Sequence, residues 1–194
     1  MKFVCQLDYP HIPYLTRLDM EGEEKEKGLK TTIKTSGCGL CSAVMLAERL
    51  IPENDFDLKE AMELSYKTGS NRRIGTNFRP YVPAFAERCG LDYEITTEPE
   101  RLLHCLQTGG AAIILARGDK NDRIGVFSHA EHYIVAISQE RDGRIAVLDP
   151  HYEDGRYAEE GRKGLVEVKN GVIALCDLQT LVDDSLNFYL FWRK

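Results

Sequence analysis

The amino-acid sequence predicts an α+β fold in which a mostly helical first half packs on a largely antiparallel sheet formed by the second half. Residues 1–109 show helical spacing of apolar side chains, whereas residues 110–194 contain short runs rich in β-branched and aromatic residues. The two kinds of segment do not alternate regularly, so we expect the helices to pack together on one side of the sheet. With 194 residues, 43% of them hydrophobic, the chain can bury one core, and we expect a single domain over residues 1–194.

The first predicted helix follows Cys38. Apolar residues recur at offsets of three and four from Leu40 onward, which is the spacing of one helix face, and Pro52 ends the pattern. A second helix is expected to begin after Asp57, whose side chain can cap the free backbone amides, and to be stopped by Gly69.

Two further helices are predicted before residue 110. The segment GTNFRPYVPAFAERCGL indicates a third helix that ends at Gly90. The segment TEPERLLHCLQTGG indicates a fourth helix with Thr97 as its cap and Gly109 just past its end.

Six short runs in the second half predict strands. Turn sequences, RDG and KNG, separate several of them, which favours a meandering antiparallel sheet. The runs are 111–116, 133–137, 144–148, 165–168, 172–175 and 188–192.

Composition and net charge argue against a nucleic-acid-binding protein and against a membrane-spanning one. The formal net charge of −6 argues against a nucleic-acid partner, because phosphate binding needs clustered Lys and Arg. We find neither an apolar run of about 18 residues nor a signal-peptide pattern, so we expect no membrane span and a cytoplasmic location. The six cysteines do not follow the spacing of a disulfide framework, so we expect free thiols. We expect the charged run 21–28 to be a solvated loop.

Cys38 is the candidate nucleophile. It stands between Gly37 and Gly39 at the expected start of a helix, where free amides and aligned peptide dipoles favour a thiolate. The two glycines permit a sharp turn into the helix and a close approach of substrate backbone. Most free cysteines are inert packing residues, and that interpretation suits the cysteines that lack this setting.

A nucleophilic thiol needs a base, and His132 is the first candidate. It opens the sequence HYIVAIS, where a strand can hold the imidazole rigidly, whereas His129 three residues earlier is the competing candidate. The connection QERDGR predicts a hairpin between HYIVAIS and RIAVLD, which places Asp149 beside His132 as an orienting acceptor. An Asp-Pro pair also serves simply to close a strand. Acyl transfer further needs oxyanion donors, one of which can be the backbone amide of Cys38.

The motifs SGCGLCSAVML and HYIVAISQERDGRIAVLDP resemble those of the papain-like cysteine peptidases related to the bacteriocin-processing, double-glycine-leader peptidases, in particular their stand-alone bacterial members. The resemblance implies a papain-like fold and a hydrolase that cleaves peptide or related amide bonds through an acyl-enzyme, with no cofactor and no metal. It implies Cys38 as nucleophile, His132 as base, Asp149 as the group that orients it, and Gln6 in the oxyanion hole.

The chain departs from this family pattern at three places. Leu40 and Cys41 stand where proline and threonine are common, and Glu131 stands before the histidine where glycine is common. Gln6 precedes Cys38 by 32 positions, a larger gap than in many papain-like enzymes. The presence of Glu131 leaves open a related protein that binds a ligand without catalysing a reaction.

Other chemistries also remain open at this stage. The CGLC sequence has the C-x-x-C form of thiol-disulfide oxidoreductases, although no buried strand is predicted directly before it. A zinc site lacks a second pair of ligands. The same thiol and imidazole could also transfer an acyl group to an amine or cleave a non-peptide amide.

Overall fold

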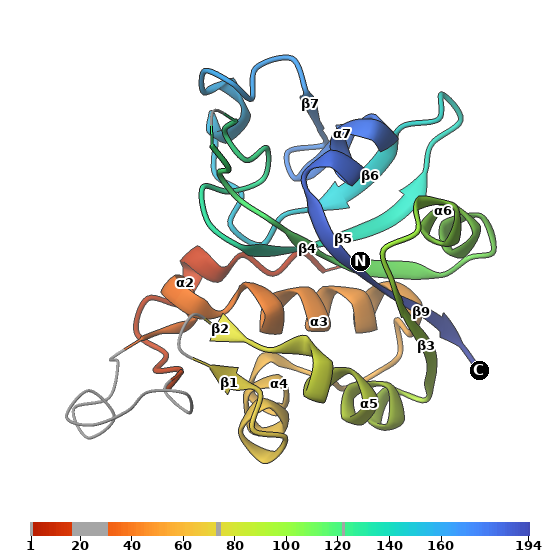
Figure 1. Cartoon of the computed structure of the whole chain (residues 1–194). Helices are drawn as coiled ribbons and strands as arrows, with labels where there is room; N and C mark the ends of the chain where they lie inside the picture. The colour runs from red at the N-terminus through yellow and green to blue at the C-terminus, as the bar shows by residue number, and fades with distance from the viewer. Residues whose placement is uncertain (1, 17–30, 73–74, 122) are drawn as a thin grey trace.

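The computed structural model describes residues 2–16, 31–72, 75–121 and 123–194. Within them, one seven-stranded sheet has the order β3-β9-β4-β5-β6-β8-β7, and every neighbouring pair is antiparallel. Its strands are β3 (Leu91–Thr96), β4 (Ala111–Ala116), β5 (His132–Gln139), β6 (Ile145–Leu148), β7 (Val166–Lys169), β8 (Ile173–Cys176) and β9 (Ser185–Arg193). A separate two-stranded ribbon pairs β1 (Asn71–Arg72) with β2 (Gly75–Thr76). The predicted antiparallel sheet is therefore confirmed (Figure 1).

Most of the helices precede the sheet in the chain. They are α2 (Ile33–Ser36), α3 (Cys38–Leu50), α4 (Leu58–Lys67), α5 (Phe78–Cys89), α6 (Pro99–Gln107) and α7 (Leu178–Asp183), together with the short 3-10 turns η1 (Gln6–Asp8) and η2 (Arg156–Ala158).

Helix α3 runs along one face of the sheet, with α4 and α5 beyond it (Figure 1). Every residue of α3 from Gly39 to Ala47 is buried, because β4 and β5 cover one side of the helix and α4 and α5 cover the other. Alternate strand residues such as Ile113 and Val135 point into this core. A helix that is apolar on nearly all sides is therefore the centre of the larger core.

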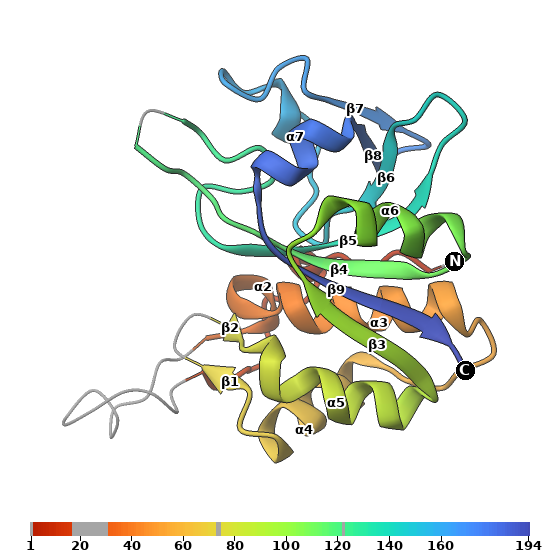
Figure 2. The same cartoon turned by 45° about the vertical axis from the view of Figure 1, so that its right-hand side comes forward.

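A second core lies on the opposite face of the sheet. Leu102 and Leu106 of α6 pack there against Ile114 and Ile134, the strand residues that alternate with those of the first core. Figure 2 shows α6 on the side of the sheet away from α3. The expectation that the helices share one side is thus wrong, because β4 and β5 are apolar on both faces and both faces need a cover.

The predicted helix ends are mostly correct. Asp57 caps α4 by accepting a hydrogen bond from the Glu60 amide, and Gly90 ends α5 in the left-handed conformation. Thr97 as the cap of α6 is wrong: Glu98 occupies that position because Pro99, which lacks an N–H, takes the first helical place.

Several elements were not predicted. Strand β3 lies within the half of the chain expected to be helical, and it pairs with the last strand β9 at the edge of the sheet. Helix α7 and the β1–β2 ribbon were also not predicted. The charged run 21–28 lies outside the described residues, in which no helix is long and apolar enough to cross a membrane. All six cysteines are free.

Candidate active site

Cys38 is the first residue of α3 and is partly exposed, whereas the residues that follow it are buried. Gly37 ends α2 and begins α3, so the chain turns sharply at the thiol. A Cβ atom on Gly39 would lie 2.7 Å from Cε2 of Phe78 and 3.2 Å from Tyr133. The helix start thus approaches its neighbours more closely than any residue with a side chain would permit.

The β5–β6 hairpin places His132 and Asp149 together. Val135 pairs with Leu148 in this hairpin, so the start of β5 lies beside the residue that follows β6. His132 Nε2 is 2.7 Å from Asp149 Oδ1, and both side chains are almost fully buried. Their proximity follows from the hairpin that the sequence predicted.

Cys38 and His132 form a coupled pair. Burial raises the pKa of Cys38, but a hydrogen bond to His132, the imidazolium charge and backbone amides of Tyr133 and Gly39 lower it, and the net pKa lies below the ordinary value. Burial lowers the pKa of His132, but the carboxylate of Asp149 and the contact with Cys38 raise it to about 9. Because Nε2 faces Asp149, Nδ1 is the ring nitrogen left for Cys38. The two shifts together favour a thiolate–imidazolium pair at neutral pH.

Three groups besides His132 also hold the Asp149 carboxylate. The backbone amide of His151 donates to Oδ1 at 2.8 Å, the Tyr157 hydroxyl donates to Oδ2 at 2.8 Å, and Arg156 Nε lies 3.0 Å from Oδ2. Burial raises the pKa of Asp149, but the charge and hydrogen bond of His132, the charge of Arg156 and the hydrogen bond from the His151 amide bring it down to about 2. The carboxylate is therefore ionised at neutral pH and fixed in orientation.

Gln6 lies in η1 and joins two segments that flank this group. Its backbone amide donates to the carbonyl of Pro150 at 2.7 Å, and its side-chain Nε2 donates to the carbonyl of Lys34 in α2 at 2.6 Å. The side chain is buried, and its Oε1 has no hydrogen-bond partner among the described residues. Gln6 is thus anchored both to the turn after Asp149 and to the helix that leads into Cys38.

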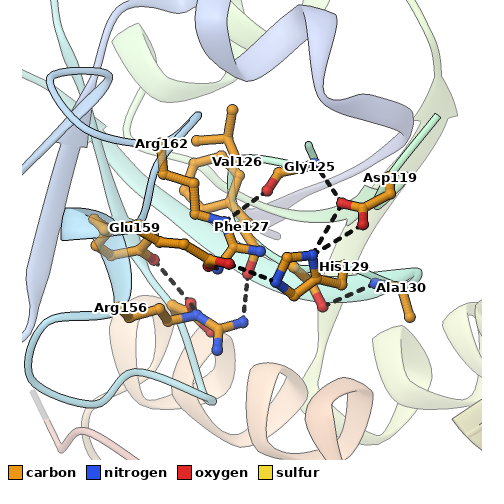
Figure 3. Close-up of polar contacts among 12 residues, drawn as sticks. Asp119, Gly125, Val126, Phe127, His129, Ala130, Arg156, Glu159 and Arg162 are labelled. Carbon is orange, nitrogen blue, oxygen red and sulfur yellow. Dashed lines mark hydrogen bonds and ion pairs between the residues drawn. The ribbon is translucent and has the colours of Figure 1, made fainter. Parts of the chain in front are cut away.

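His129, the competing base, lies elsewhere. It is exposed, and its Nδ1 lies 2.9 Å from Asp119 Oδ2 while its Nε2 lies 3.1 Å from Glu159 Oε1 (Figure 3). Both ring nitrogens are therefore engaged in a contact between two surface loops. The structure places His132, and not His129, next to Cys38.

The same two loops hold Arg156 in place. Arg162, which is buried, donates from Nε to the carbonyl of Gly125 at 2.8 Å and pairs with Glu159, and Arg156 donates to the carbonyl of Phe127 (Figure 3). Arg156 therefore reaches Asp149 from a loop that is tied to its neighbour at several points.

A pocket of about 310 Å³ opens beside Cys38. Glu131, the residue that departs from the family pattern, stands on its wall and is exposed. The lining residues are Cys38, Arg72, Gly75, Thr76, Asn77, Arg79, Leu115, Glu131, Tyr133, Asn187 and Tyr189.

Sequence reasoning missed Arg156 and Tyr157 beside Asp149 and the arginines of the pocket. Arg72 lies in the two-residue strand β1, and Arg156 and Tyr157 lie in the short turn η2, where neither periodicity nor a motif marks a residue. Arg79 lies in the first turn of α5, where the helical pattern does not show that it lines a pocket. The one available signal was the proximity of Arg156 in the chain to Asp149, and this does not distinguish it from an ordinary surface arginine.

No family model matches the chain, and no curated protein matches its sequence significantly. Solved structures do match. The peptidase domain of Streptococcus ComA, a bifunctional ABC transporter involved in a quorum-sensing pathway, aligns with a TM-score of 0.54 and 12% identity over 95% of this chain and 100% of that chain. A protein described as a C39-like peptidase from Bacillus anthracis aligns with a TM-score of 0.53 and 13% identity over 100% and 99%. The chain therefore has the fold of these peptidase domains, as its motifs predicted.

Proposed function

We propose that this protein is a cysteine hydrolase that cleaves peptide or related amide bonds through an acyl-enzyme. The observation that carries the proposal is the arrangement of Cys38 at the start of α3, where His132 lowers the pKa of the thiol, with His132 Nε2 2.7 Å from the buried carboxylate of Asp149. A fold alone does not assign chemistry. The fold shared with peptidase domains supports the proposal because the residues of the site agree with it.

The chemistry follows from the protonation states. The Cys38 thiolate attacks the carbonyl carbon of the amide, and the His132 imidazolium then donates its proton to the leaving nitrogen, so that a thioester forms and the amine departs. Water next attacks the thioester while neutral His132 accepts a proton from it. The carbon–sulfur bond breaks, the acid leaves, and the thiolate–imidazolium pair is restored. Asp149 keeps Nε2 engaged and so directs Nδ1 at the sulfur throughout.

Each tetrahedral intermediate carries an oxyanion that needs donors. We assign this role to the backbone amide of Cys38 and to Nε2 of Gln6. One proton of that Gln6 nitrogen binds the Lys34 carbonyl, which fixes the side chain and leaves the second proton for the substrate. The buried position of Gln6 supports the assignment, because a donor fixed in advance costs no reorganisation during the reaction.

Burial of Cys41 weighs against thiol-disulfide exchange as the function. Its side chain is fully buried, and burial raises its pKa far above that of an ordinary thiol. A resolving cysteine must form a thiolate that reaches a mixed disulfide, and Cys41 meets neither condition. We assign Cys41 to core packing.

The test combines trapping with cleavage. The protein is incubated with an activated ester, and the acyl group is located by mass spectrometry after rapid acid quench. Cleavage of a mixed peptide library is followed in parallel. We expect acylation of Cys38, loss of both signals in Cys38→Ser, and strong reduction in His132→Ala.

The matched control is Cys5→Ala, since Cys5 is a partly exposed thiol outside the proposed group. Unchanged acylation in that variant is expected. Acylation of the wild type at a site other than Cys38, or none at all, contradicts the proposal. An added primary amine separates hydrolase from acyltransferase: capture of most of the acyl group by the amine at low concentration would assign transfer.

A further inference from the structure

We propose that the pocket beside Cys38 is a subsite for a negatively charged side chain of the peptide substrate, with Arg72 and Arg79 as its specificity-determining residues. The inference deepens the proposed function and rests on it, because the pocket is read as part of the cleft of an enzyme whose nucleophile is Cys38. Four observations support it.

The first is that both arginines line the pocket that contains Cys38, and neither has an ion-pair partner among the described residues. Arg72 is half-buried and Arg79 is exposed. Most other described arginines are neutralised by a carboxylate: Arg88, Arg101, Arg123, Arg144, Arg156, Arg162 and Arg193. In a chain with net charge −6, two arginines without a carboxylate partner therefore lie on the same pocket.

The second observation is the start of α5. Asn77 caps this twelve-residue helix by accepting a hydrogen bond from the Arg79 amide, and Thr76 and Asn77 both line the pocket. The positive end of the helix dipole thus lies at the pocket wall, where it adds to the charge of the arginines.

The third observation is the apolar part of the pocket lining. Tyr133, Tyr189 and Leu115 provide apolar surface against which the methylene groups of a glutamate or aspartate can pack. The pocket is therefore suited to a side chain with an apolar stem and an anionic end.

The fourth observation concerns Glu131, the one carboxylate among the described residues that line the pocket. Burial raises the pKa of the Tyr189 hydroxyl, the charge of Arg79 lowers it and that of Glu131 raises it, so both charges act on the same wall. The positive charge of two arginines and of the N-terminus of α5 exceeds the negative charge of one exposed glutamate. Glu131 then moderates the attraction for an anion and does not reverse it.

The first test compares two alkylating agents of similar size, iodoacetate and iodoacetamide. Each forms a sulfur–carbon bond to Cys38 and releases iodide, and both depend on the same thiolate, so the ratio of their rates isolates the effect of the reagent's charge. We expect the iodoacetate-to-iodoacetamide ratio to fall about threefold in Arg72→Gln, about threefold in Arg79→Gln, and about tenfold in the double variant, as expected for charges several ångströms apart near a protein surface. Glu131→Gln should raise the ratio by a similar factor.

The control is Arg141→Gln. Arg141 is exposed and has no ion-pair partner among the described residues, but it lies in the turn between β5 and β6, at the end of β5 opposite His132. At about 3.3 Å per residue that strand separates it from the site by roughly 20 Å. Its ratio should equal that of the wild type.

The second test uses peptides with Glu, Gln or Lys at each position beside the scissile bond, each as a free acid and as a C-terminal amide. We expect Glu to raise kcat/KM at one position in both end forms, and Arg79→Glu to shift the preference toward Lys. A preference that requires the free terminal acid would assign the arginines to a terminal carboxylate and overturn the side-chain assignment.

The two proposals fail in different ways. If Cys38 is rapidly alkylated in a manner that requires His132, but the ratio is the same in the wild type and the double arginine variant, the subsite proposal is refuted and the hydrolase proposal stands. If Cys38 reacts with both reagents no faster than an ordinary thiol, the hydrolase proposal fails and the subsite with it.

Discussion

Replacing Asp149 with asparagine keeps the shape of the side chain and removes the charge that holds the His132 proton. In the wild type, burial alone would push the pKa of His132 below 6.5, and Asp149, whose Oδ1 is 2.7 Å away, together with Cys38 instead raises it to about 9. Without that charge, we expect burial to outweigh the remaining effect of Cys38 and the imidazole to be neutral at pH 7. Cys38 then loses the hydrogen bond and the positive charge that lower its pKa.

The size of the effect follows from the thiolate fraction. At pH 6.5 a thiol with an ordinary pKa of about 8.5 is only about 1% ionised, whereas a paired thiolate is largely ionised, which gives a loss of about a hundredfold. A thiolate of higher pKa is intrinsically more nucleophilic, and this regains roughly a factor of ten. We therefore expect alkylation of Cys38 by iodoacetamide at pH 6.5 to be about tenfold to a hundredfold slower in Asp149→Asn.

The assay is the pH profile of that alkylation rate, with modification located by mass spectrometry. The wild type should react from below neutral pH, and its profile should change near pH 9, where His132 loses its proton. Asp92→Asn, at an exposed position of β3, is the control and should match the wild type.

Superimposable profiles for the wild type and a folded Asp149→Asn would refute the reasoning. Asparagine leaves the buried guanidinium of Arg156 without its partner, so the variant's circular dichroism and thermal unfolding are measured first. Should it fail to fold, the wild-type profile alone decides the matter, because an ordinary thiol profile for Cys38 excludes the charged pair.

Three further predictions concern single residues. Gln6→Ala should lower kcat/KM for peptide cleavage about a hundredfold while leaving iodoacetamide alkylation of Cys38 within about twofold, since alkylation develops no oxyanion; equal losses in both assays would instead indicate damage to the fold. Gly39→Ala places a Cβ 2.7 Å from Phe78 and should lower the free energy of unfolding by about 1–3 kcal/mol in urea titrations; an unchanged midpoint would contradict the close approach at the start of α3. Asp149 contributes stability above its unfolded pKa of 3.8, and this is lost as pH falls toward about 2. Arg156→Met should move that loss to higher pH and lower stability at pH 7 by about 3 kcal/mol; urea unfolding at a series of pH values measures both effects, and an unshifted acid limb would show that Arg156 does not act on Asp149.

The contacts that sequence could predict are those set by short-range patterns. The turn between β5 and β6 predicts the hairpin, and the hairpin, with a register shift between Ala136 and Ser138, brings Asp149 to His132. The apolar spacing after Cys38 predicts the helix, and the helix places the thiol at its N-terminus. Each step links residues fewer than twenty positions apart, within which turn and period decide the geometry.

What could not be predicted depends on long-range packing. Nothing in the sequence of α6 says which face of the sheet it covers, because β4 and β5 are apolar on both faces. Strand β3 has an exposed, mixed composition and forms a strand because β9 provides an edge to pair with. Arg72 and Arg79 become a pair only when the ribbon and α5 fold against Cys38.

Both proposals depend on positive charge near Cys38, but salt affects the two sources of that charge differently. The charges that stabilise the Cys38 thiolate come from His132, which is buried and in hydrogen-bond contact with the sulfur, so dissolved ions screen them little. The arginines of the pocket are exposed or half-buried and act on a group that arrives from solvent, so their attraction weakens as the Debye length shrinks from about 10 Å at 0.1 M salt to about 3 Å at 1 M. Raising salt should therefore leave the iodoacetamide rate nearly constant while the iodoacetate preference falls toward its value in the double arginine variant. Salt therefore separates the two effects in one protein, because the thiolate of Cys38 is stabilised by the adjacent His132, whereas the arginines act on a substrate group through solvent.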